Sequence, residues 1–355
     1  MSNNKSIKIN TIPISTIESA LATSTPLTPQ TDLNTHMHPL TDIQAAIPHL
    51  PHRAPDAIQP FVLLSPWLDL IISSQRLDPA DCHRIKLPSF YCENLFKAGK
   101  TWQVSREVRS STKEELAGDF PLRTVEGKRM EEVFGSGKKY FVRLDTCNLK
   151  DAMELPGKGV WGRDVKVGHL PLISSEQIWQ RIVTSERGVE GIDCLGNVGD
   201  LVFVYLFPWR EEVGKGTEFW VFCPPLLGDL AAISQYKWLE ALDLELGSDS
   251  EGGRREERLR NWAEELWKGV KEVHGRIMDH PNMTDDLKES GFTFDVAEVD
   301  LAPGKDGESS KEVQLVELNP FGAMSGCGSC LFNWVKDARV IYGMEDHVEL
   351  RLALE

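Results

Sequence analysis

The chain has 355 residues, of which 41% are hydrophobic, and its 39 basic and 54 acidic residues give a formal net charge of −15. This length allows one large domain or two packed lobes. The acidic balance argues against a general nucleic-acid binder, which normally carries a basic excess. The sequence contains no run of 18 apolar residues and no apolar secretory stretch, so we expect no membrane association. Seven cysteines spread through the chain are typical of free thiols in the cytoplasm.

Residues 1–58 are rich in Ser, Thr, Pro and Asn, and prolines interrupt every periodic pattern. We expect a mostly disordered tail here, with a short helix near 15–22. The rest of the chain is expected to divide into an N-terminal lobe over 59–200 and a C-terminal lobe over 201–355. Four histidines are scattered through the tail, and this scatter favours a flexible segment over a metal site. They are His36, His38, His49 and His52.

The globular part begins near residue 60. The apolar stretch 60–72 is compatible with a helix or with a buried strand, and 138–145 is typical of a strand. Ser174 is followed three residues later by Gln177, and this capping-box pattern predicts a helix over 174–183. The glycine-bearing "GSGKK" that precedes the strand is expected to form a turn rather than a phosphate loop.

Two pairs of strands and a long helix are predicted in the second half of the chain. The stretches 201–209 and 217–223 are predicted to form an antiparallel hairpin, and 292–302 is predicted to pair with 312–319 across a polar turn. Between these pairs, 254–280 is predicted to be an amphipathic helix. Its apolar residues recur at steps of three or four and are Leu259, Trp262, Leu266, Val270, Val273 and Ile277.

The last predicted strand places an acid and an amide on one face, because successive side chains alternate and Leu315, Glu317 and Asn319 share a side. A buried carboxylate is costly unless it is paired, hydrogen-bonded or bound to a metal. A hairpin with the preceding strand would bring Asp295 close to Glu317. Two carboxylates and an amide form an all-oxygen ligand set that suits Mg²⁺ and leaves room for phosphate oxygens. The alternative is that Glu317 pairs with a Lys or Arg and Asn319 caps the turn before Pro320.

The stretch "GAMSGCGSCLFNW" contains Cys327 and Cys330 as a single C-x-x-C. A structural zinc site normally needs a second such pair, and a redox dithiol normally lies between a strand and a helix. Two free thiols are therefore the favoured interpretation, with redox chemistry and metal binding as alternatives. The motifs of phosphate-loop, dinucleotide-binding, zinc-protease and serine-hydrolase sites do not occur, and no catalytic residue is assigned.

"FTFDV", "VQLVELNPFG" and "CLFNW" together resemble the end of the Cdc123 (D123) proteins. The pieces "YFVRLDTCNLKDA", "TEFWVFC", "AAISQYKW" and "VELRLALE" resemble further family motifs in the same order, so the resemblance covers roughly 120–355. It implies an α+β, ATP-grasp-like fold with mixed and antiparallel sheets, in which two lobes hold a nucleotide between them. It also implies ATP and Mg²⁺ as cofactors and a protein partner, namely translation initiation factor 2 during its assembly.

The resemblance also assigns functional residues, each at the position that matches a family motif. Arg143 falls where a phosphate-facing Lys is expected, and Lys150 begins the motif (Lys/Arg)-Asp-Ala. Trp209 aligns with the Trp that ends the hinge strand near the adenine, and Glu218 aligns with the acid of Glu-Phe-Arg. The implied metal ligands are Asp295, Glu317 and Asn319.

Several cations of the family pattern are replaced in this chain. Trp220 stands for the Arg of Glu-Phe-Arg, Tyr236 for the Arg of Ser-Gln-Arg, and Val183 for the Lys of Lys-Ser-Ser-Asp. Neutralising a triphosphate is most of what such a site must do, so we expect nucleotide binding to be weakened, altered or lost. Three functions stay open: an assembly factor that binds Mg-ATP, a carboxylate ligase of the ATP-grasp type, and a degenerate member that binds a protein without nucleotide. The missing arginines count against the ligase.

Overall fold

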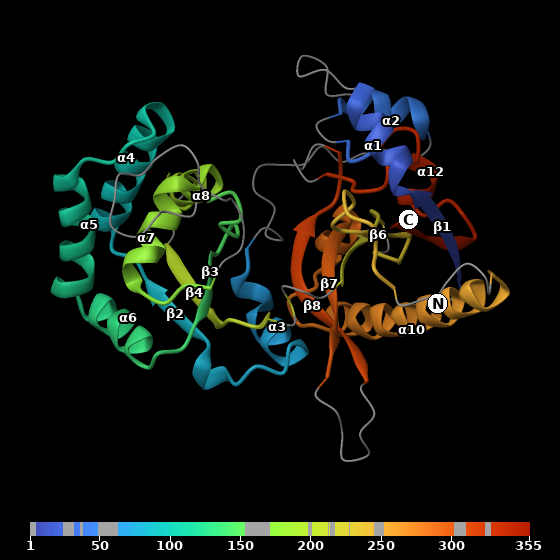
Figure 1. The fold of residues 1–355 in the computed structure, drawn as a ribbon. Helices are drawn as coiled ribbons and strands as arrows, with labels where there is room; N and C mark the ends of the chain where they lie inside the picture. The colour runs from blue at the N-terminus through green and yellow to red at the C-terminus, as the bar shows by residue number, and fades with distance from the viewer. Residues whose placement is uncertain are drawn as a thin grey trace. The chain divides into compact units, whose positions relative to one another are not determined.

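The chain folds into two compact units in this computed structural model (Figure 1). Unit 1 comprises Met1–Val62, Pro66–Gln75 and Lys215–Glu355, and unit 2 comprises Leu63–Ser65 and Arg76–Gly214. Each unit has its own sheet and helices, so the predicted α+β organisation in two lobes is confirmed. The structure describes residues 5–23, 32–35, 38–48, 63–152, 171–197, 201–211, 213, 217–226, 228–244, 252–301, 310–323 and 328–355.

Unit 1 is built on a six-stranded mixed sheet. β9 pairs in parallel with the two strands beside it, and the remaining neighbours are antiparallel. The predicted pairing of the strands near 292–302 and 312–319 is confirmed as β7 and β8. In sheet order the strands are β1 Ser6–Pro13, β9 His347–Leu354, β6 Ala232–Gln235, β5 Thr217–Cys223, β7 Phe292–Asp300 and β8 Lys311–Pro320.

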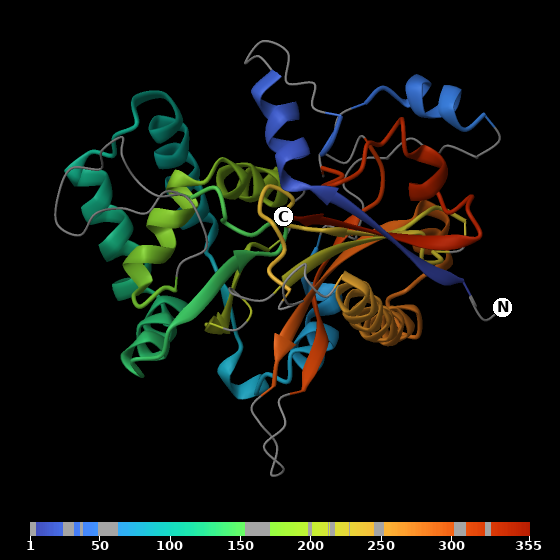
Figure 2. The same ribbon diagram turned by 45° about the vertical axis from the view of Figure 1, so that its right-hand side comes forward.

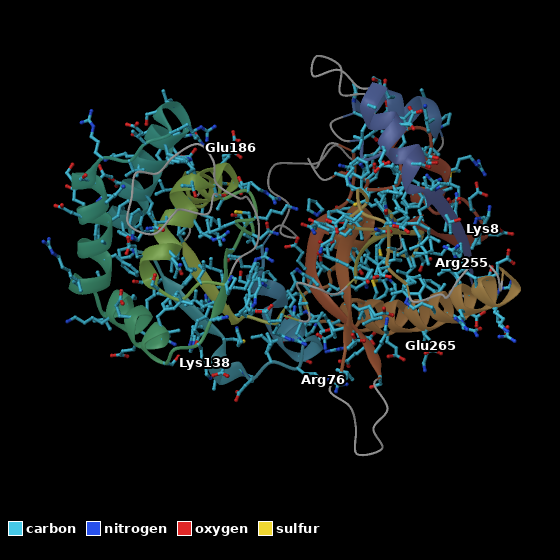
Figure 3. All side chains as sticks on the ribbon, in the orientation of Figure 1. Lys8, Arg76, Lys138, Glu186, Arg255 and Glu265 are labelled. Atoms are coloured by element: carbon cyan, nitrogen blue, oxygen red, sulfur yellow. The ribbon has the colours of Figure 1, made fainter. Side chains whose placement is uncertain are left out.

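The helix α10, Gly252–Met278, covers one face of this sheet and confirms the predicted amphipathic helix (Figure 2). Its apolar stripe is buried, with Leu266 and Val270 fully inaccessible to solvent. Exposed charged side chains, among them Glu265, lie along the side away from the sheet (Figure 3). The indole of Trp262 donates a hydrogen bond of 3.0 Å to the carboxylate of Glu298 on β7. The buried carboxylate of Glu298 thus accepts a hydrogen bond from an uncharged donor, the Trp262 indole.

The opposite face of the sheet is covered by segments from both ends of the chain. Ile43 of the N-terminal part packs in one cluster with Phe321, Trp334 and Ile341 of the C-terminal part. The other helices of unit 1 are α1 Ile14–Thr23, α2 Leu40–Ala46, α3 Leu68–Ser74, α11 Asp285–Ser290 and α12 Ala338–Ile341, and a 3-10 turn at Ser65–Trp67 begins in unit 2 and ends in unit 1.

The predicted disorder of residues 1–58 is wrong for the part of this segment that the structure describes. β1 pairs with β9 over its whole length, and α1 confirms the short helix expected near 15–22. Asn34 donates its backbone N–H to the carbonyl of Cys330 at 2.7 Å, which ties the segment to the C-terminal region a second time. Both partners of the segment lie at the far end of the chain, so local composition carried no sign of them. His36, His49 and His52 lie outside the described residues.

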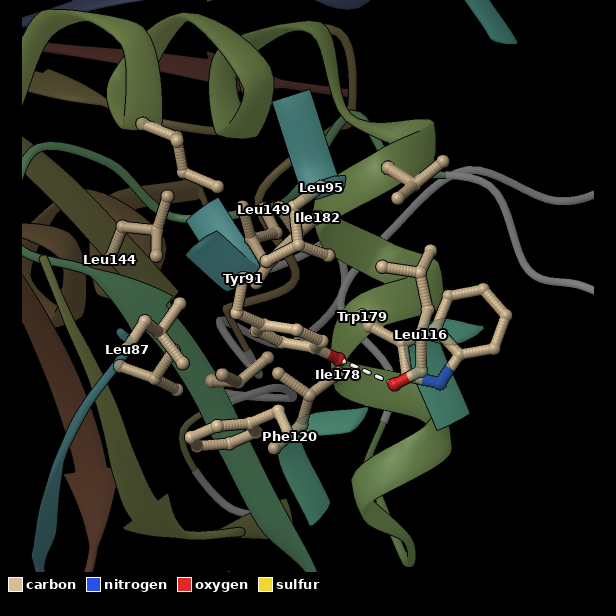
Figure 4. Close-up of a cluster of buried hydrophobic side chains, with 14 of the residues drawn as sticks. Leu87, Tyr91, Leu95, Leu116, Phe120, Leu144, Leu149, Ile178, Trp179 and Ile182 are labelled. Atoms are coloured by element: carbon tan, nitrogen blue, oxygen red, sulfur yellow. Dashed lines mark hydrogen bonds between the residues drawn. The ribbon is translucent and has the colours of Figure 1, made fainter. Parts of the chain in front are cut away.

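Unit 2 has a three-stranded antiparallel sheet with a helical layer on one face. Its core joins the sheet to the helices, as in the contact of Tyr91 with Phe120, whose rings stack at 4.7 Å (Figure 4). The Tyr91 hydroxyl donates to the Leu116 carbonyl at 2.9 Å. The strands are β2 His83–Lys86, β4 Phe203–Pro208 and β3 Tyr140–Leu144, and the helices are α4 Ser89–Ser105, α5 Ser110–Arg123, α6 Val125–Gly135, α7 Ser175–Thr184 and α8 Glu186–Asn197, with a 3-10 turn at Pro79–Asp81.

The local predictions for unit 2 are confirmed, whereas one long-range prediction is wrong. Ser174 accepts a hydrogen bond from the Gln177 amide at the start of α7, as the capping box predicts. The predicted hairpin of 201–209 with 217–223 does not form, because β4 pairs with β2 and β3 while β5 pairs with β6 and β7. Unit 2 therefore extends to Gly214, beyond the predicted boundary at 200.

The described part of the apolar stretch, residues 63–72, contains the 3-10 turn Ser65–Trp67 and the beginning of helix α3, Leu68–Ser74, and contains no strand. Six cysteines are described and all six are free thiols, whereas Cys327 lies outside the described residues. Among the described helices, none combines the length and the apolar character needed to cross a bilayer.

Candidate functional site

The acid and the amide that the sequence singled out meet a second acid on the neighbouring strand. Asp295 of β7 is directly opposite Glu317 of β8, and Thr293 is opposite Asn319. Residues that are opposite each other in antiparallel strands point to the same side of the sheet. Asp295, Glu317 and Asn319 therefore share one face, and Asp295 is fully buried there. This is the face opposite α10.

A β-bulge adjoins the pair and changes one prediction. The register shifts between Asp295 and Val296, so that Leu315 is opposite Val296 and Val316 is the extra residue of β8. Leu315 therefore lies on the other face from Glu317, and its predicted place beside Glu317 is wrong. Its side chain is fully buried in the core instead. Because of the bulge, β8 presents Glu317 and Asn319 on one face of the sheet and Leu315, two positions before Glu317, on the other.

β5 adds an aromatic pair and a third carboxylate to this face. Trp220 is opposite Asp295 on the other side of β7, and Glu218 lies two residues before it on the same face. The Tyr236 ring stacks on Trp220, with centroids 6.0 Å apart and an interplanar angle of 17°. Burial raises the pKa of the Tyr236 hydroxyl well above its usual value. The negative charges of Asp295, Glu218 and Glu317 raise that pKa further.

The chemistry of this donor set fits a hard divalent cation. Carboxylates that face each other on paired strands repel, and a cation between them removes the repulsion. The side-chain nitrogen of Asn319 is buried and has no hydrogen-bond partner among the described residues. Exchanging the nitrogen and oxygen of this amide places the oxygen, which can bind a metal ion, at the same buried position. The described residues include no group of three or more His, Cys, Asp or Glu that could hold a metal. A cation at this face would thus complete its shell with water or phosphate, as Mg²⁺ commonly does.

The predicted phosphate contact Arg143 lies in unit 2, in a row of residues across the small sheet. Arg143 of β3 is opposite Tyr205 of β4, and Tyr205 is opposite Arg84 of β2. The Arg84 guanidinium lies 3.7 Å from the centroid of the Phe203 ring. This row lies on the face opposite the helical core. Sequence reasoning missed Arg84, although the alternation of basic residues with Ile85 in β2 was a signal for it.

Asp145 fixes the tyrosine in the middle of that row. Its carboxylate accepts hydrogen bonds from the Ser65 amide at 2.7 Å and from the Tyr205 hydroxyl at 3.2 Å. Burial, and then the negative charge of Asp145, raise the pKa of Tyr205 to about 12. Tyr205 therefore stays protonated at neutral pH and separates Arg84 from Arg143 as an uncharged side chain.

The motif that contains Lys150 anchors the beginning of α8. Asp151 accepts hydrogen bonds from the Ser185 hydroxyl at 2.6 Å and from the Arg187 amide at 3.1 Å. Ala152 is fully buried. The acid of this motif therefore has a structural role, and Lys150 beside it is half-buried.

Trp209 lies at the far end of the small sheet from Arg143. It follows the last residue of β4, and its amide donates to the Lys139 carbonyl at 2.8 Å. It is four residues beyond Tyr205, or about 13 Å along an extended strand. The sheet of unit 2 therefore does not bring Trp209 and Arg143 together, whereas the sheet of unit 1 does bring together Glu218 and the three predicted metal ligands.

Solved structures decide the fold. The structure of Cdc123 from Schizosaccharomyces pombe superposes with a TM-score of 0.52 at 15% identity, over 82% of this chain and 95% of that chain. A C-terminally truncated Cdc123 from the same organism gives a TM-score of 0.53 at 16% identity, over 85% of this chain and 100% of that chain. The chain has the Cdc123 fold. The family resemblance and the predicted ATP-grasp-like fold are therefore confirmed at the level of fold. No protein-family model and no curated protein sequence matches the chain.

Proposed function

We propose that the chain binds Mg²⁺ and ATP and acts as an assembly factor for a protein complex, by resemblance the translation initiation factor 2. The observation that carries the proposal is the direct opposition of Asp295 and Glu317 on β7 and β8, with Asn319 two residues further on the same face. A protein commonly supplies one or two carboxylates to a Mg²⁺ ion that also binds phosphates, and an amide oxygen is a further hard ligand. Arg143 and Lys150 of unit 2 are the proposed phosphate contacts.

Thermal unfolding with and without ligand tests the metal and nucleotide part. Ligand at a hundred times its Kd stabilises the native state by about 2.7 kcal/mol, which raises the midpoint by several degrees for a protein of this size. We expect this rise only when ATP and Mg²⁺ are both present. Asp295→Asn and Glu317→Gln should each abolish it. Asp300→Asn is the matched control, because Asp300 lies exposed at the end of the same strand. A rise of the same size in all three variants contradicts the metal assignment.

The protein-partner part needs a separate measurement. A purified subunit of translation initiation factor 2 is titrated into the chain with Mg-ATP, with ATP and EDTA, and with no addition. An assembly factor that depends on nucleotide should bind with a lower Kd when Mg-ATP is present, and Asp295→Asn should remove this difference. Equal affinity in all three solutions contradicts a nucleotide-dependent role.

The stacked pair of Trp220 and Tyr236 favours a second candidate function. Both side chains occupy positions where the resemblance predicts arginines, and neither can neutralise a phosphate. A protein of the Cdc123 fold that binds its partner without nucleotide accounts for this replacement. Under this candidate the partner binds with one Kd in all three solutions, and neither ATP nor Mg²⁺ changes the unfolding midpoint.

A further inference from the structure

Unit 2 brings a second arginine to the loop that follows β3, at a position that no sequence motif marked. Arg143 and Asn148 are opposite each other in an antiparallel bridge, so their side chains point to the same side. The side-chain oxygen of Asn148 accepts a hydrogen bond from Nη1 of Arg187 at 3.2 Å. Asn148 therefore holds the Arg187 guanidinium on the side where Arg143 lies.

The backbone at Arg187 is fixed from two directions. Asp151 accepts hydrogen bonds from the Arg187 amide and from the Ser185 hydroxyl, and Ser185 in turn accepts the Gly188 amide at 2.8 Å. These bonds satisfy the amides of Arg187 and Gly188, the second and third residues of α8, inside the protein. Those two amides are therefore not free to bind an anion, and the candidate donors are side chains. The carboxylate of Asp151 is itself directed at its two donors.

Cys147 contacts the backbone of Arg187 in the same loop region. Its Sγ lies 3.3 Å from the Arg187 carbonyl oxygen. Burial raises the pKa of this thiol, and the positive charges of Arg143 and Arg187 act in the opposite direction. Arg143 is buried, with 6% of its surface exposed, whereas Arg187 is exposed. Figure 3 marks its neighbour Glu186 at the beginning of α8. One cation of the pair is thus held in the protein and the other reaches solvent.

Position 183 cannot supply the cation that the resemblance predicts there. Val183 is fully buried in the core of unit 2, where a charged side chain would be costly. Arg187 follows four residues later, past the Ser185 cap that ends α7 and begins α8. A guanidinium binds phosphate through two parallel hydrogen bonds and keeps its charge at any accessible pH.

We propose that Arg187, positioned by Asn148 beside Arg143, is the second phosphate-binding cation of unit 2 and replaces the lysine expected at position 183. The ligand class, a polyphosphate, rests on the proposed function. Arg187 touches the ligand in this proposal, whereas Asn148 acts through Arg187 as a positioning residue.

Metal-free tripolyphosphate is the probe, titrated calorimetrically in EDTA at low salt, because it tests the cations without the acids of unit 1. Arg187→Ala should raise the Kd about tenfold to a hundredfold, the value of one charge-assisted bidentate contact. Arg187→Gln keeps a donor for Asn148 without the charge and should lose as much. Arg187→Lys should lose less. Arg109→Ala is the matched control, an exposed arginine of the same unit before α5, and should leave the Kd unchanged.

A positioning role for Asn148 has its own signature. Asn148→Ala should raise the Kd for tripolyphosphate severalfold in the otherwise wild-type protein. It should have no effect on the Kd when the protein already carries Arg187→Gln. Additive losses in the double variant contradict the link through Arg187.

Two outcomes separate this inference from the proposed function. If Arg187→Ala and Arg187→Gln lower the unfolding midpoint but leave the Kd for tripolyphosphate unchanged, Arg187 is a structural clamp and the inference is overturned, whatever Mg-ATP does at Asp295. If both variants lose tripolyphosphate while Asp295→Asn leaves the response to Mg-ATP unchanged, the inference stands and the metal assignment fails. Equal weakening by Arg109→Ala means diffuse charge attraction and also overturns the inference.

Discussion

The two units of this chain carry their charges in opposite ways. Unit 2 contains 21 basic and 21 acidic residues, so 18 of the 39 basic and 33 of the 54 acidic residues lie in unit 1, which holds the whole net charge of −15. In unit 1 acids face each other on paired strands, whereas in unit 2 cations lie on the sheet face opposite the core and around Asn148. Acids gathered in this way favour a metal ion, and cations gathered in this way favour an anion.

The units also differ in what positions their polar groups. Strand register fixes Asp295 opposite Glu317, and register depends on the buried pairing of whole strands. The arrangement of Arg187 depends on single hydrogen bonds from Asn148 and Asp151. We therefore expect that the loss of one hydrogen bond leaves Asp295 opposite Glu317 in unit 1 but displaces the Arg187 side chain in unit 2.

The largest effect should come from breaking the core of unit 2 alone. Phe120 has 1% of its surface exposed and stacks on Tyr91. Phe120→Ala should lower the free energy of unfolding by about 3–5 kcal/mol, through lost burial and the cavity left behind. Hydrogen exchange should speed up at the amides of α5 and α7, while β7 and β8 of unit 1 keep their protection. Val104→Ala, at 89% exposure, is the control and should change the free energy by less than about 0.5 kcal/mol.

A smaller effect, dependent on pH, is expected in unit 1. Burial alone would raise the pKa of Glu349, but hydrogen bonds from Arg351 and Asn10 outweigh it and hold the pKa below the ordinary 4.5. A carboxyl group with a lowered pKa stabilises the fold above its ordinary pKa and loses that contribution as the pH falls through its lowered value. Glu349→Gln should therefore lower the free energy of unfolding by about 1–2 kcal/mol at pH 7.

The difference between wild type and Glu349→Gln should shrink as the pH falls below about 4.5, where the unfolded chain begins to bind the proton. Urea unfolding at several pH values between 7 and 3 measures it. A difference that stays constant down to pH 3 contradicts the lowered pKa.

A cation added to the acidic face of unit 1 should weaken Mg²⁺ binding there. Tyr236 stacks on Trp220, which is opposite Asp295, and the charges of Asp295, Glu218 and Glu317 act on the pKa of its hydroxyl. Tyr236→Arg should raise the Kd for Mg²⁺ about tenfold, because the new charge repels the ion. Tyr236→Phe keeps the ring without the charge and should leave the Kd near that of the wild type. If Tyr236→Arg leaves the Kd for Mg²⁺ unchanged, the ion is not bound at this face.

The smallest effect tests a local bond of unit 2. Ser174 accepts the Gln177 amide at the start of α7. Ser174→Ala should lower the free energy of unfolding by about 1 kcal/mol, and Ser174→Gly by only a few tenths of that, because glycine is itself tolerated at a helix N-cap. Chemical denaturation resolves the two values. Equal losses in both variants would mean that the hydroxyl makes no useful bond.

Much of the secondary structure and part of the site followed from short stretches of sequence. The stripe of α10, the cap of α7 and the strands on either side of the polar turn depend on neighbours a few residues apart, and their periodicity is visible in the chain itself. The sequence also predicted that Asp295 and Glu317 lie close together, because β7 and β8 are consecutive strands. The Cdc123 resemblance rested on motifs of this local kind and was confirmed as a fold.

Tertiary structure alone decided the features that depend on distant partners. β1 pairs with β9 from the other end of the chain, and β4 and β5 join different sheets although eight residues separate them. The bulge at Val316 reversed the face of Leu315, and the fold brought Asn148 to Arg187. Local sequence fixes the period of an element, but a strand edge or a hydrogen-bonding side chain accepts whichever partner the packed core brings to it.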